Sequence, residues 1–320
     1  MARFAGINLK SGWGLSSEIE VISPRLCETA IKNGASIIFT PTITAKDPLD
    51  HPEYYYPRFN LLSDGPQGPI IITRPLSSHE SEIDSILVQK NDAVKVASIA
   101  AGDFKTLLEL LDKYERKAHI IEFDLMASCL LAKRNYIYIA ELAGELKHVT
   151  KLPLSVKIPL TIAQLIDITL FVEENNIDAL VVSPNLVYAI GDHYFRIHSP
   201  FFSTAALVSV AEVLHEINVN VAFVTRTDVK DLESLIPIRL YDVTYAYENI
   251  GVKGIGWRNI PLSWKPISRK LKIFAREAVD VCPYGLIISQ GFVEGCNYCG
   301  VCIDLSAPGL VKLASYITPQ

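Results

Sequence analysis

Short apolar runs rich in β-branched residues alternate along the chain with stretches whose apolar residues recur at helical spacing. The runs that predict buried strands are 36–40, 93–98, 119–123, 154–158, 179–183, 219–224 and 241–245. Helical spacing predicts helices over 24–33, 104–117, 139–151, 162–176, 205–217 and 229–236, and Gly34 is suited to end the first of them. Strands that are buried on both faces and alternate with helices indicate a parallel sheet.

The number of strands distinguishes between two kinds of parallel-sheet fold. The clear strands, together with one weaker candidate at either 4–9 or 70–73, make eight. We therefore predict an α/β fold of the (β/α)8 type, a TIM barrel, rather than an open doubly wound sheet. The alternation ends near residue 255.

The remainder of the chain differs in composition from the barrel region. Residues 256–270 are rich in Pro, Trp and basic residues, and apolar spacing predicts a helix over 271–281. We divide the chain into a barrel at 1–255, a linker with a docking helix at 256–280, and a small module at 281–320. Trp257 and Trp264 are expected to dock the linker on the barrel.

Composition excludes several classes of function. Apolar residues make up 49% of the chain, charged residues 20%, and the net charge is −5. These values describe a soluble globular protein without the basic field that attracts nucleic acid. We find neither an apolar run long enough for a transmembrane helix nor a secretion signal, so we expect a cytoplasmic protein that does not enter the membrane. Motifs for catalytic zinc, nicotinamide or nucleotide phosphate binding are also lacking.

Four of the six cysteines fall within residues 282–302. In a reducing compartment such crowding indicates a metal site rather than disulfides. The other two, Cys27 and Cys129, are interpreted as small buried apolar residues.

The spacing within this group favours an iron–sulfur cluster. Cys296, Cys299 and Cys302 form a C-x2-C-x2-C motif, and Cys282, directly before a proline, supplies a fourth ligand. Gly295 and Gly300 would allow the tight turns that a loop around a cluster needs. The segment resembles one half of a bacterial two-cluster ferredoxin, which implies one [4Fe–4S] cluster. Zinc is the alternative, although zinc sites usually have two separated C-x2-C pairs.

Several short stretches in the barrel region carry a second resemblance. They are Ala5-Gly6-Ile7 with Ser11-Gly12, Asn33-Gly34-Ala35 with Thr42-Ile43-Thr44, Tyr56-Pro57-Arg58, Ile121-Glu122-Phe123-Asp124, and Pro153 with Val156-Lys157. In their order and spacing they resemble landmarks of dihydroorotate dehydrogenase, a flavin-binding (β/α)8 enzyme, over about residues 1–255. The resemblance implies that Lys157 is a retained contact to flavin. The alternative is a lysine paired with an acid such as Glu122 or Asp124.

The residues that would carry catalysis in that family are replaced. Pro41 stands in place of a lysine, Asp124 in place of a substrate-binding asparagine, and Ala127 in place of the Cys or Ser base. Ala127 cannot accept a proton, and Ser128 or Cys129 could take that role only after a shift in register. We therefore assign no catalytic residue.

The flavin phosphate site is also altered. Thr225-Arg226 and Tyr245-Ala246-Tyr247 follow the last two strands where the family has small residues, and bulky residues occupy 193–202. Bulk there would collide with a phosphate, although Arg226 could bind one through its forked guanidinium. We expect no FMN in this chain, and a flavin-bearing alternative stays open.

An intact cysteine motif beside a degenerate flavin site suggests a division of labour. The resemblance implies an electron-accepting subunit of an archaeal-type dihydroorotate dehydrogenase in pyrimidine biosynthesis, an oxidoreductase component that is not catalytic alone. Its partner in a hetero-oligomer would be a flavin-bearing catalytic subunit. Two alternatives remain. One is a self-sufficient FMN and iron–sulfur oxidoreductase acting on dihydroorotate or a similar pyrimidine, and the other is a non-enzymatic scaffold with a structural cluster.

Tyr54-Tyr55-Tyr56 could form a lid, a partner-facing patch or a packed rim loop.

Overall fold

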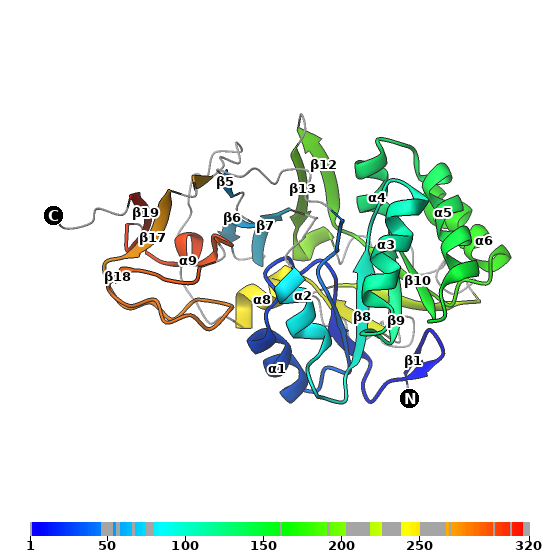
Figure 1. Ribbon diagram of the computed structural model, residues 1–320, viewed down its shortest axis with the longest axis horizontal. Helices are drawn as coiled ribbons and strands as arrows, with labels where there is room; N and C mark the ends of the chain where they lie inside the picture. Colours follow the sequence, from blue (N-terminus) through cyan, green and yellow to red (C-terminus); the bar gives the residue numbers. More distant parts are fainter. Residues whose placement is uncertain are drawn as a thin grey trace.

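Eight parallel strands close into a barrel in a computed structural model of the chain (Figure 1). The barrel strands, in chain order, are β3 (Trp13–Leu15), β4 (Ile37–Phe39), β8 (Val94–Ile99), β9 (Ile120–Asp124), β10 (Leu154–Pro159), β11 (Ala179–Ser183), β14 (Asn220–Val224) and β15 (Ile238–Tyr241). The structure describes residues 2–45, 54–55, 58–65, 68–74, 80–160, 162–190, 193–202, 218–225, 238–249, 267–268, 270–296, 298–307 and 309–315. The predicted TIM barrel is confirmed.

Helices pack around the outside of the barrel (Figure 1). They are α1 (Pro24–Lys32), α2 (Glu80–Leu87), α3 (Phe104–Tyr114), α4 (Leu125–Ala132), α5 (Tyr136–Val149), α6 (Ile162–Glu174) and α8 (Val243–Asn249). Helix α3 begins where the Asp103 side chain accepts a hydrogen bond from the Thr106 N–H at 2.9 Å. The predicted helices at 205–217 and 229–236 lie outside the described residues.

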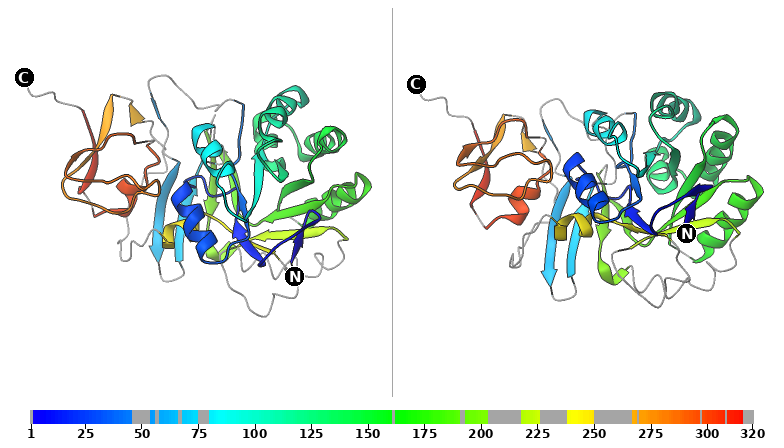
Figure 2. Two further views of the ribbon diagram at one scale, coloured as in Figure 1. Left: turned by 60° about the horizontal axis from the view of Figure 1, so that its bottom comes forward. Right: turned by 90° about the horizontal axis from the view of Figure 1, so that it is seen from below.

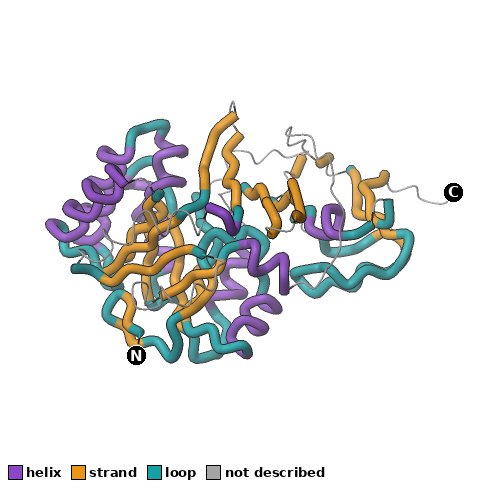
Figure 3. The backbone as a smooth tube through the Cα atoms, turned by 180° about the vertical axis from the view of Figure 1, so that it is seen from behind, coloured by secondary structure: helices purple, strands orange, loops and turns teal. Residues whose placement is uncertain are grey.

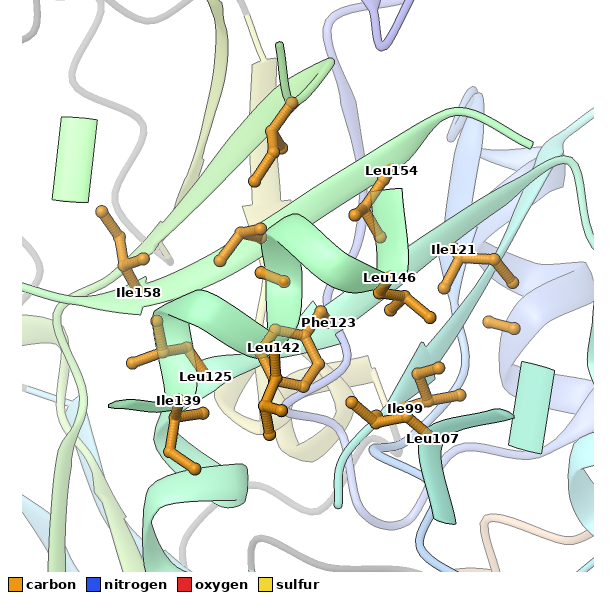
Figure 4. Packing of buried hydrophobic residues seen from close by; sticks show 14 of the residues in the cluster. Ile99, Leu107, Ile121, Phe123, Leu125, Ile139, Leu142, Leu146, Leu154 and Ile158 are labelled. Atoms are coloured by element: carbon orange, nitrogen blue, oxygen red, sulfur yellow. The ribbon is translucent and has the colours of Figure 1, made fainter. Parts of the chain in front are cut away.

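One layer of the core lies between the helices and the strands. Leu142 and Leu146 of α5 pack with Phe123 of β9 and Leu154 of β10 (Figure 4). All four side chains are buried. Burial of each such side chain contributes about 1.5–3 kcal/mol, so this layer stabilises the packing of the helices on the strands.

The first barrel strand differs from both predicted candidates. It is β3, whereas 4–9 forms the hairpin β1 (Arg3–Phe4) and β2 (Ile7–Asn8), and 70–73 belongs to β7 (Gly68–Thr73). Both candidates were therefore wrong. Gly14 shows why the strand is hard to recognise, since a Cβ there would lie 1.9 Å from the Ile37 carbonyl oxygen. The close approach of two backbones requires glycine, which weakens the strand signal.

The predicted strand at 241–245 was also wrong. Strand β15 ends at Tyr241, and the next residues form α8. Asp242 explains the change, because its carboxylate accepts hydrogen bonds from the backbone N–H and the hydroxyl of Thr244, the former at 2.9 Å. Such a side-chain bond to the backbone favours the start of a helix over continuation of the strand.

A four-stranded antiparallel sheet lies between the barrel and the C-terminal part of the chain (Figures 1 and 3). Its order is β12 (Leu186–Ile190), β13 (His193–His198), β7 and β6 (Phe59–Gly65). Strand β13 pairs with β7 through Arg196 opposite Thr73, and β7 pairs with β6 through Thr73 opposite Phe59. These three residues form one row across the sheet.

The C-terminal lobe, residues 270–315, forms one end of the molecule in every ribbon view (Figures 1 and 2). Strands β17 (Leu271–Ala275), β18 (Gly291–Phe292) and β19 (Val311–Ser315) form its sheet, and α9 (Val301–Leu305) packs beside β19. The predicted helix at 271–281 was wrong, because β17 pairs with a strand on each side. Apolar side chains of this segment pack in the lobe's core, while the backbone of β17 pairs with a strand on each side.

Two further predictions concern segments that connect these parts. Tyr54–Tyr55 forms β5, which pairs with β16 (Ile267–Ser268), whereas Tyr56, Trp257 and Trp264 lie outside the described residues. None of the helices in the described part of the chain combines the length and apolar composition of a membrane span.

Candidate functional site

The four clustered cysteines line one cavity in the C-terminal lobe. Cys282 comes from the loop after β17, and the other three come from the loop that leads into α9 and from α9 itself. The cavity has about 330 Å³ of space between atoms, counted out to its open side. Its remaining lining is apolar or glycine: Ile273, Pro283, Leu286, Ile288, Val293 and Gly300. The structure thus brings together all the cysteines that the sequence predicted as ligands.

The loop that carries three of them turns tightly. Gly295 and Gly300 have φ of 72° and 88°, and Tyr298 also lies in the left-handed region at 58°. The Tyr298 N–H donates to the Cys296 sulfur at 3.2 Å, and the backbone of Val301 hydrogen-bonds the Cys299 thiol. Backbone N–H groups directed at cysteine sulfurs are a recurring way of stabilising thiolates and tuning iron–sulfur clusters.

Burial controls the charge of the Cys296, Cys299 and Cys302 thiols when no metal is bound. It raises the pKa of Cys302 to about 12, and it raises the pKa of Cys296 and, more strongly, of Cys299. The neighbouring thiolates act in the same direction on Cys299 and Cys302. Because a metal ligand must be a thiolate, binding a metal here has to release protons.

The cysteine side chains would have to move to bind either of the two metals considered. Among the residues that the structure describes, no three Cys, His, Asp or Glu side chains are placed to hold one metal ion. A tetrahedral zinc with Zn–S bonds of about 2.3 Å would draw its sulfurs to within about 4 Å of one another. The cavity has room for little more than a water molecule, so the cysteine side chains would have to rotate outward around a cluster. Four thiols around a shared cavity supply the donors that either metal needs, so the preference for a cluster rests on the C-x2-C-x2-C spacing.

The cysteine loops are anchored on the barrel. The Cys299 carbonyl accepts a hydrogen bond from the Phe59 N–H at 3.2 Å, and the Pro283 carbonyl accepts one from the Ser23 hydroxyl. Cys299 packs in a core cluster that also includes Leu15 and Leu26 of the barrel region. The lobe is therefore held against the barrel at the cysteines themselves.

The other two cysteines lie apart from this site. Cys27 is buried in α1, and Cys129 is half-buried in α4. Burial raises the pKa of each thiol to about 12. Their surroundings agree with the prediction that they act as small apolar residues.

The barrel mouth, at the carboxyl ends of the strands, holds a dense group of buried charges. It contains the side chains of Glu18, Glu20, Glu122, Asp124, Lys157, Asn185, Arg196, His198 and Asp242, all 6% exposed or less. The first two follow β3, and Arg196 and His198 project from β13 of the four-stranded sheet. This is the face on which TIM barrels place their active sites.

Lys157 lies at the centre of this group. Its Nζ is 2.5 Å from Asp124 Oδ2, 3.8 Å from Glu18 Oε1 and 2.8 Å from the Ser17 hydroxyl. Burial by itself would raise the pKa of Asp124, but the charges of Lys157 and Arg196 together lower it. The ion pair matches the alternative offered for this lysine, and its contact with flavin stays a prediction.

Arg196 closes the mouth from the other side. Its guanidinium lies 2.8 Å from Glu20 Oε1, 3.4 Å from Glu18 Oε1 and 3.5 Å from Asp124 Oδ2. Burial raises the pKa of Glu20 to about 7, despite the opposing effect of Arg196 and His198. The cavity left between Glu18, Lys157 and Arg196 has about 210 Å³ between atoms, counted out to solvent, and little more room than a water molecule needs.

The positions considered for a catalytic base do not supply one. Ala127 lies buried in the first turn of α4, where its N–H donates to Asp124 Oδ1 at 3.0 Å. The Ser128 hydroxyl accepts a hydrogen bond from the Ala101 N–H at 3.2 Å. With Cys129 held as a thiol by burial, none of the three is poised to accept a proton. Arg226, the residue considered for a flavin phosphate, lies outside the described residues.

Sequence reasoning missed five ionisable residues of the mouth: Glu18, Glu20, Arg196, His198 and Asp242. A signal was present for the first two, since they alternate with Ile19 and Val21 in an otherwise apolar stretch. Acids in such a stretch indicate a polar partner inside the fold. The partners, Arg196 and His198, are almost two hundred residues away and belong to a sheet that was not predicted.

Comparison with known proteins gives matches only among solved structures. The chain matches no protein-family model and no curated protein. FabK from Thermotoga maritima is similar over 79% of this chain and 69% of its own, at 12% identity and a TM-score of 0.45. An HpcH/HpaI aldolase from Desulfitobacterium hafniense DCB-2 is similar over 78% of this chain and 95% of its own, at 12% identity and a TM-score of 0.40. Likenesses this distant carry no argument about activity, and the barrel is assigned from its own strand order.

Proposed function

We propose that this chain is an iron–sulfur electron-transfer subunit of a dihydroorotate dehydrogenase complex. One [4Fe–4S] cluster would be held by Cys282, Cys296, Cys299 and Cys302, and it would accept electrons from a flavin-bearing catalytic partner. The observation that carries the proposal is the convergence of these thiols on one cavity, with backbone hydrogen bonds to the sulfurs of Cys296 and Cys299. The cluster supplies reversible one-electron transfer, which no side chain of this site provides.

The barrel mouth supports an accessory role rather than a catalytic one. Its cations are paired, since Lys157 lies against Asp124 and Arg196 against Glu20. Four buried atoms in the described part of the mouth, Glu20 Oε2, Glu122 Oε2, Asn185 Oδ1 and Arg196 Nε, have no hydrogen-bond partner. A flavin entering the mouth would have to separate these buried pairs. Breaking a buried pair typically costs about 3–5 kcal/mol, so flavin chemistry is better assigned to a partner.

The surroundings of Cys282 support electron exchange with a partner. This residue lines both the cysteine cavity and a separate surface cleft between α1, α8 and the loop before Pro283. The cleft has about 420 Å³ between atoms, counted out to solvent, and Arg25 and Asp280 lie along it. A cluster bound at Cys282 would therefore lie close to the surface at a place that another protein can approach.

The assignment to dihydroorotate dehydrogenase rests on the sequence motifs around Thr42–Thr44, Ile121–Asp124 and Val156–Lys157. The decisive experiment uses the full chain, purified without oxygen, alone and with a flavin-bearing barrel protein of the same organism. We expect about four iron and four sulfide per chain, no stoichiometric flavin in the chain alone, and reduction of the cluster by dihydroorotate only when the partner is present. Tight flavin and dihydroorotate turnover by the chain alone would overturn the proposal in favour of the self-sufficient enzyme.

A structural role for the cluster is the second candidate. It is favoured by the hydrogen bonds that join Cys299 to Phe59 and Pro283 to Ser23, because these make the cluster loops part of the contact between lobe and barrel. A structural cluster would remain oxidised on addition of dithionite, as judged by electron spin resonance. A cluster that is reduced reversibly would exclude this candidate.

A further inference from the structure

A buried ion pair lies beside the cysteine loop and is not one of the pairs formed by the side chains of the barrel mouth. Arg58 Nη1 is 2.7 Å from Glu82 Oε2, and the two side chains are 4% and 13% exposed. Arg58 directly precedes β6, and the next residue, Phe59, donates its N–H to the Cys299 carbonyl at 3.2 Å. Arg58 is therefore the sequence neighbour of Phe59, whose backbone contacts the proposed cluster ligand Cys299.

The guanidinium is only partly engaged. Nη1 binds Glu82 and also donates to the Glu20 carbonyl at 3.4 Å, whereas Nη2 is buried and donates to no acceptor among the described residues. Burial alone would lower the pKa of Arg58, but the negative forms of Glu82, Tyr284 and Cys299 outweigh it and raise the pKa. The positive charge is thus within electrostatic reach of a thiolate at Cys299.

We propose that Arg58 raises the reduction potential of the cluster and that Glu82 limits this effect. The inference rests on the proposed function, because it concerns the same four-cysteine site. Reduction adds one negative charge to a cluster, and a buried cation stabilises that added charge more strongly than a cation in water does. Glu82 carries the opposite charge and partly cancels the benefit.

Exposed charges near the same site are expected to matter less. Arg25 lies along the cleft that reaches Cys282, and its Nη1 is 3.6 Å from Asp280. Its side chain and that of Asp280 are 56% and 85% exposed. Water and salt screen such a charge, so Arg25 provides a matched control with the same change of charge.

The test is a redox titration of the anaerobically purified holoprotein, followed by electron spin resonance. Arg58→Met should reduce the equilibrium constant for one-electron reduction by about threefold or more, which is a potential about 30 mV lower or beyond. Glu82→Gln should shift the potential in the opposite direction. Arg58→Lys should keep most of the wild-type value because it keeps the charge, and Arg25→Met should shift it less than Arg58→Met.

The results separate failure of this inference from failure of the proposed function. Wild-type protein without iron and sulfide would refute both. An intact cluster whose potential moves in the same direction, or not at all, in Arg58→Met and Glu82→Gln would refute only the role of Arg58. Should Arg58→Met fail to fold, Glu82→Gln decides the matter, since it keeps the shape of the side chain, and an unshifted potential in it counts against the inference.

Discussion

The barrel mouth and the cysteine cavity are both buried, yet their polar groups are satisfied in different ways. In the mouth, carboxylates face Lys157 and Arg196, so the charges largely compensate one another within the chain. The cysteine cavity has four thiols and a lining that contains no charged side chain. Burial of unpaired ionised groups is expensive, so the carboxylates of the mouth depend on their cations, whereas the buried thiols of Cys296, Cys299 and Cys302 would need a metal to ionise. Under the proposed function, the metal-dependent chemistry lies in the lobe.

The largest expected effect is loss of the cluster. Cys299→Ser should eliminate nearly all bound iron and sulfide and the cluster's spin-resonance signal. A [4Fe–4S] cluster that loses one of its four thiolate ligands is no longer held on every iron atom. Cys129→Ser is the matched control, since this half-buried cysteine lies in α4 away from the cavity. Iron and sulfide assays check both. Full iron content in Cys299→Ser would mean that the four-cysteine assignment is incorrect.

The next effect concerns the mouth. Lys157→Met removes the cation that faces Asp124 and Glu18 and leaves buried carboxylates without a positive charge beside them. The free energy of unfolding should therefore fall by about 3–5 kcal/mol. Denaturant unfolding measures this. Iron content of the folded fraction should not change, which distinguishes the two regions.

Lys147→Met is the control for the mouth variant. Lys147 pairs with Asp178 at 2.5 Å, but their side chains are 24% and 31% exposed. We expect a loss of about 1 kcal/mol or less, because water screens the pair. Equal losses for Lys147→Met and Lys157→Met would contradict a mouth held together by desolvated charges.

A smaller effect should appear in the pH dependence. Burial raises the pKa of Glu20 from 4.5 to about 7, so the folded chain binds a proton more tightly than the unfolded chain does. The resulting stabilisation is present in full below pH 4.5 and is lost as pH rises towards 7. Glu20→Gln should therefore reduce the loss of stability between pH 5 and pH 8 by about 1–3 kcal/mol. Melting curves across this range test the sign, and an unchanged slope would speak against a protonated Glu20.

The smallest effect concerns the contact between the two regions. The Ser23 side chain caps α1 by accepting from the Leu26 N–H at 3.2 Å, and its hydroxyl also donates to the Pro283 carbonyl. Ser23→Ala should cost about 1 kcal/mol and should speed the loss of iron to a chelator. Thr29→Ala, in the same helix with a more exposed hydroxyl bond to the Arg25 carbonyl, is the control. Equal chelation rates in the two variants would show that Ser23 does not help to hold the cysteine loop.

Local signals in the sequence account for much of the fold. The run Ala93–Ser98 predicted β8 because its β-branched residues suit a strand buried on both faces. Strand β3 was not predicted because it is short and contains Gly14. The close backbone of the neighbouring strand leaves no room for a side chain at that position. At 241–245, residues with high β-propensity favoured a strand in the prediction. The structure has the start of a helix there, and that start depends on the side chain of Asp242. Where a residue's role is set by a partner distant in sequence, pattern and propensity mislead.

By itself, the sequence determined the parallel barrel and the group of cysteines, since strand periodicity and the C-x2-C-x2-C spacing are local properties of the chain. Only the tertiary structure decided that Cys282 shares a cavity with the other three, that Arg196 fills the mouth, and that Arg58 lies next to the contact with Cys299. Each of these depends on segments far apart in sequence that meet only when the barrel, the sheet and the lobe pack together. Burial then fixes which charges are paired and raises the pKa of the thiols at Cys296, Cys299 and Cys302.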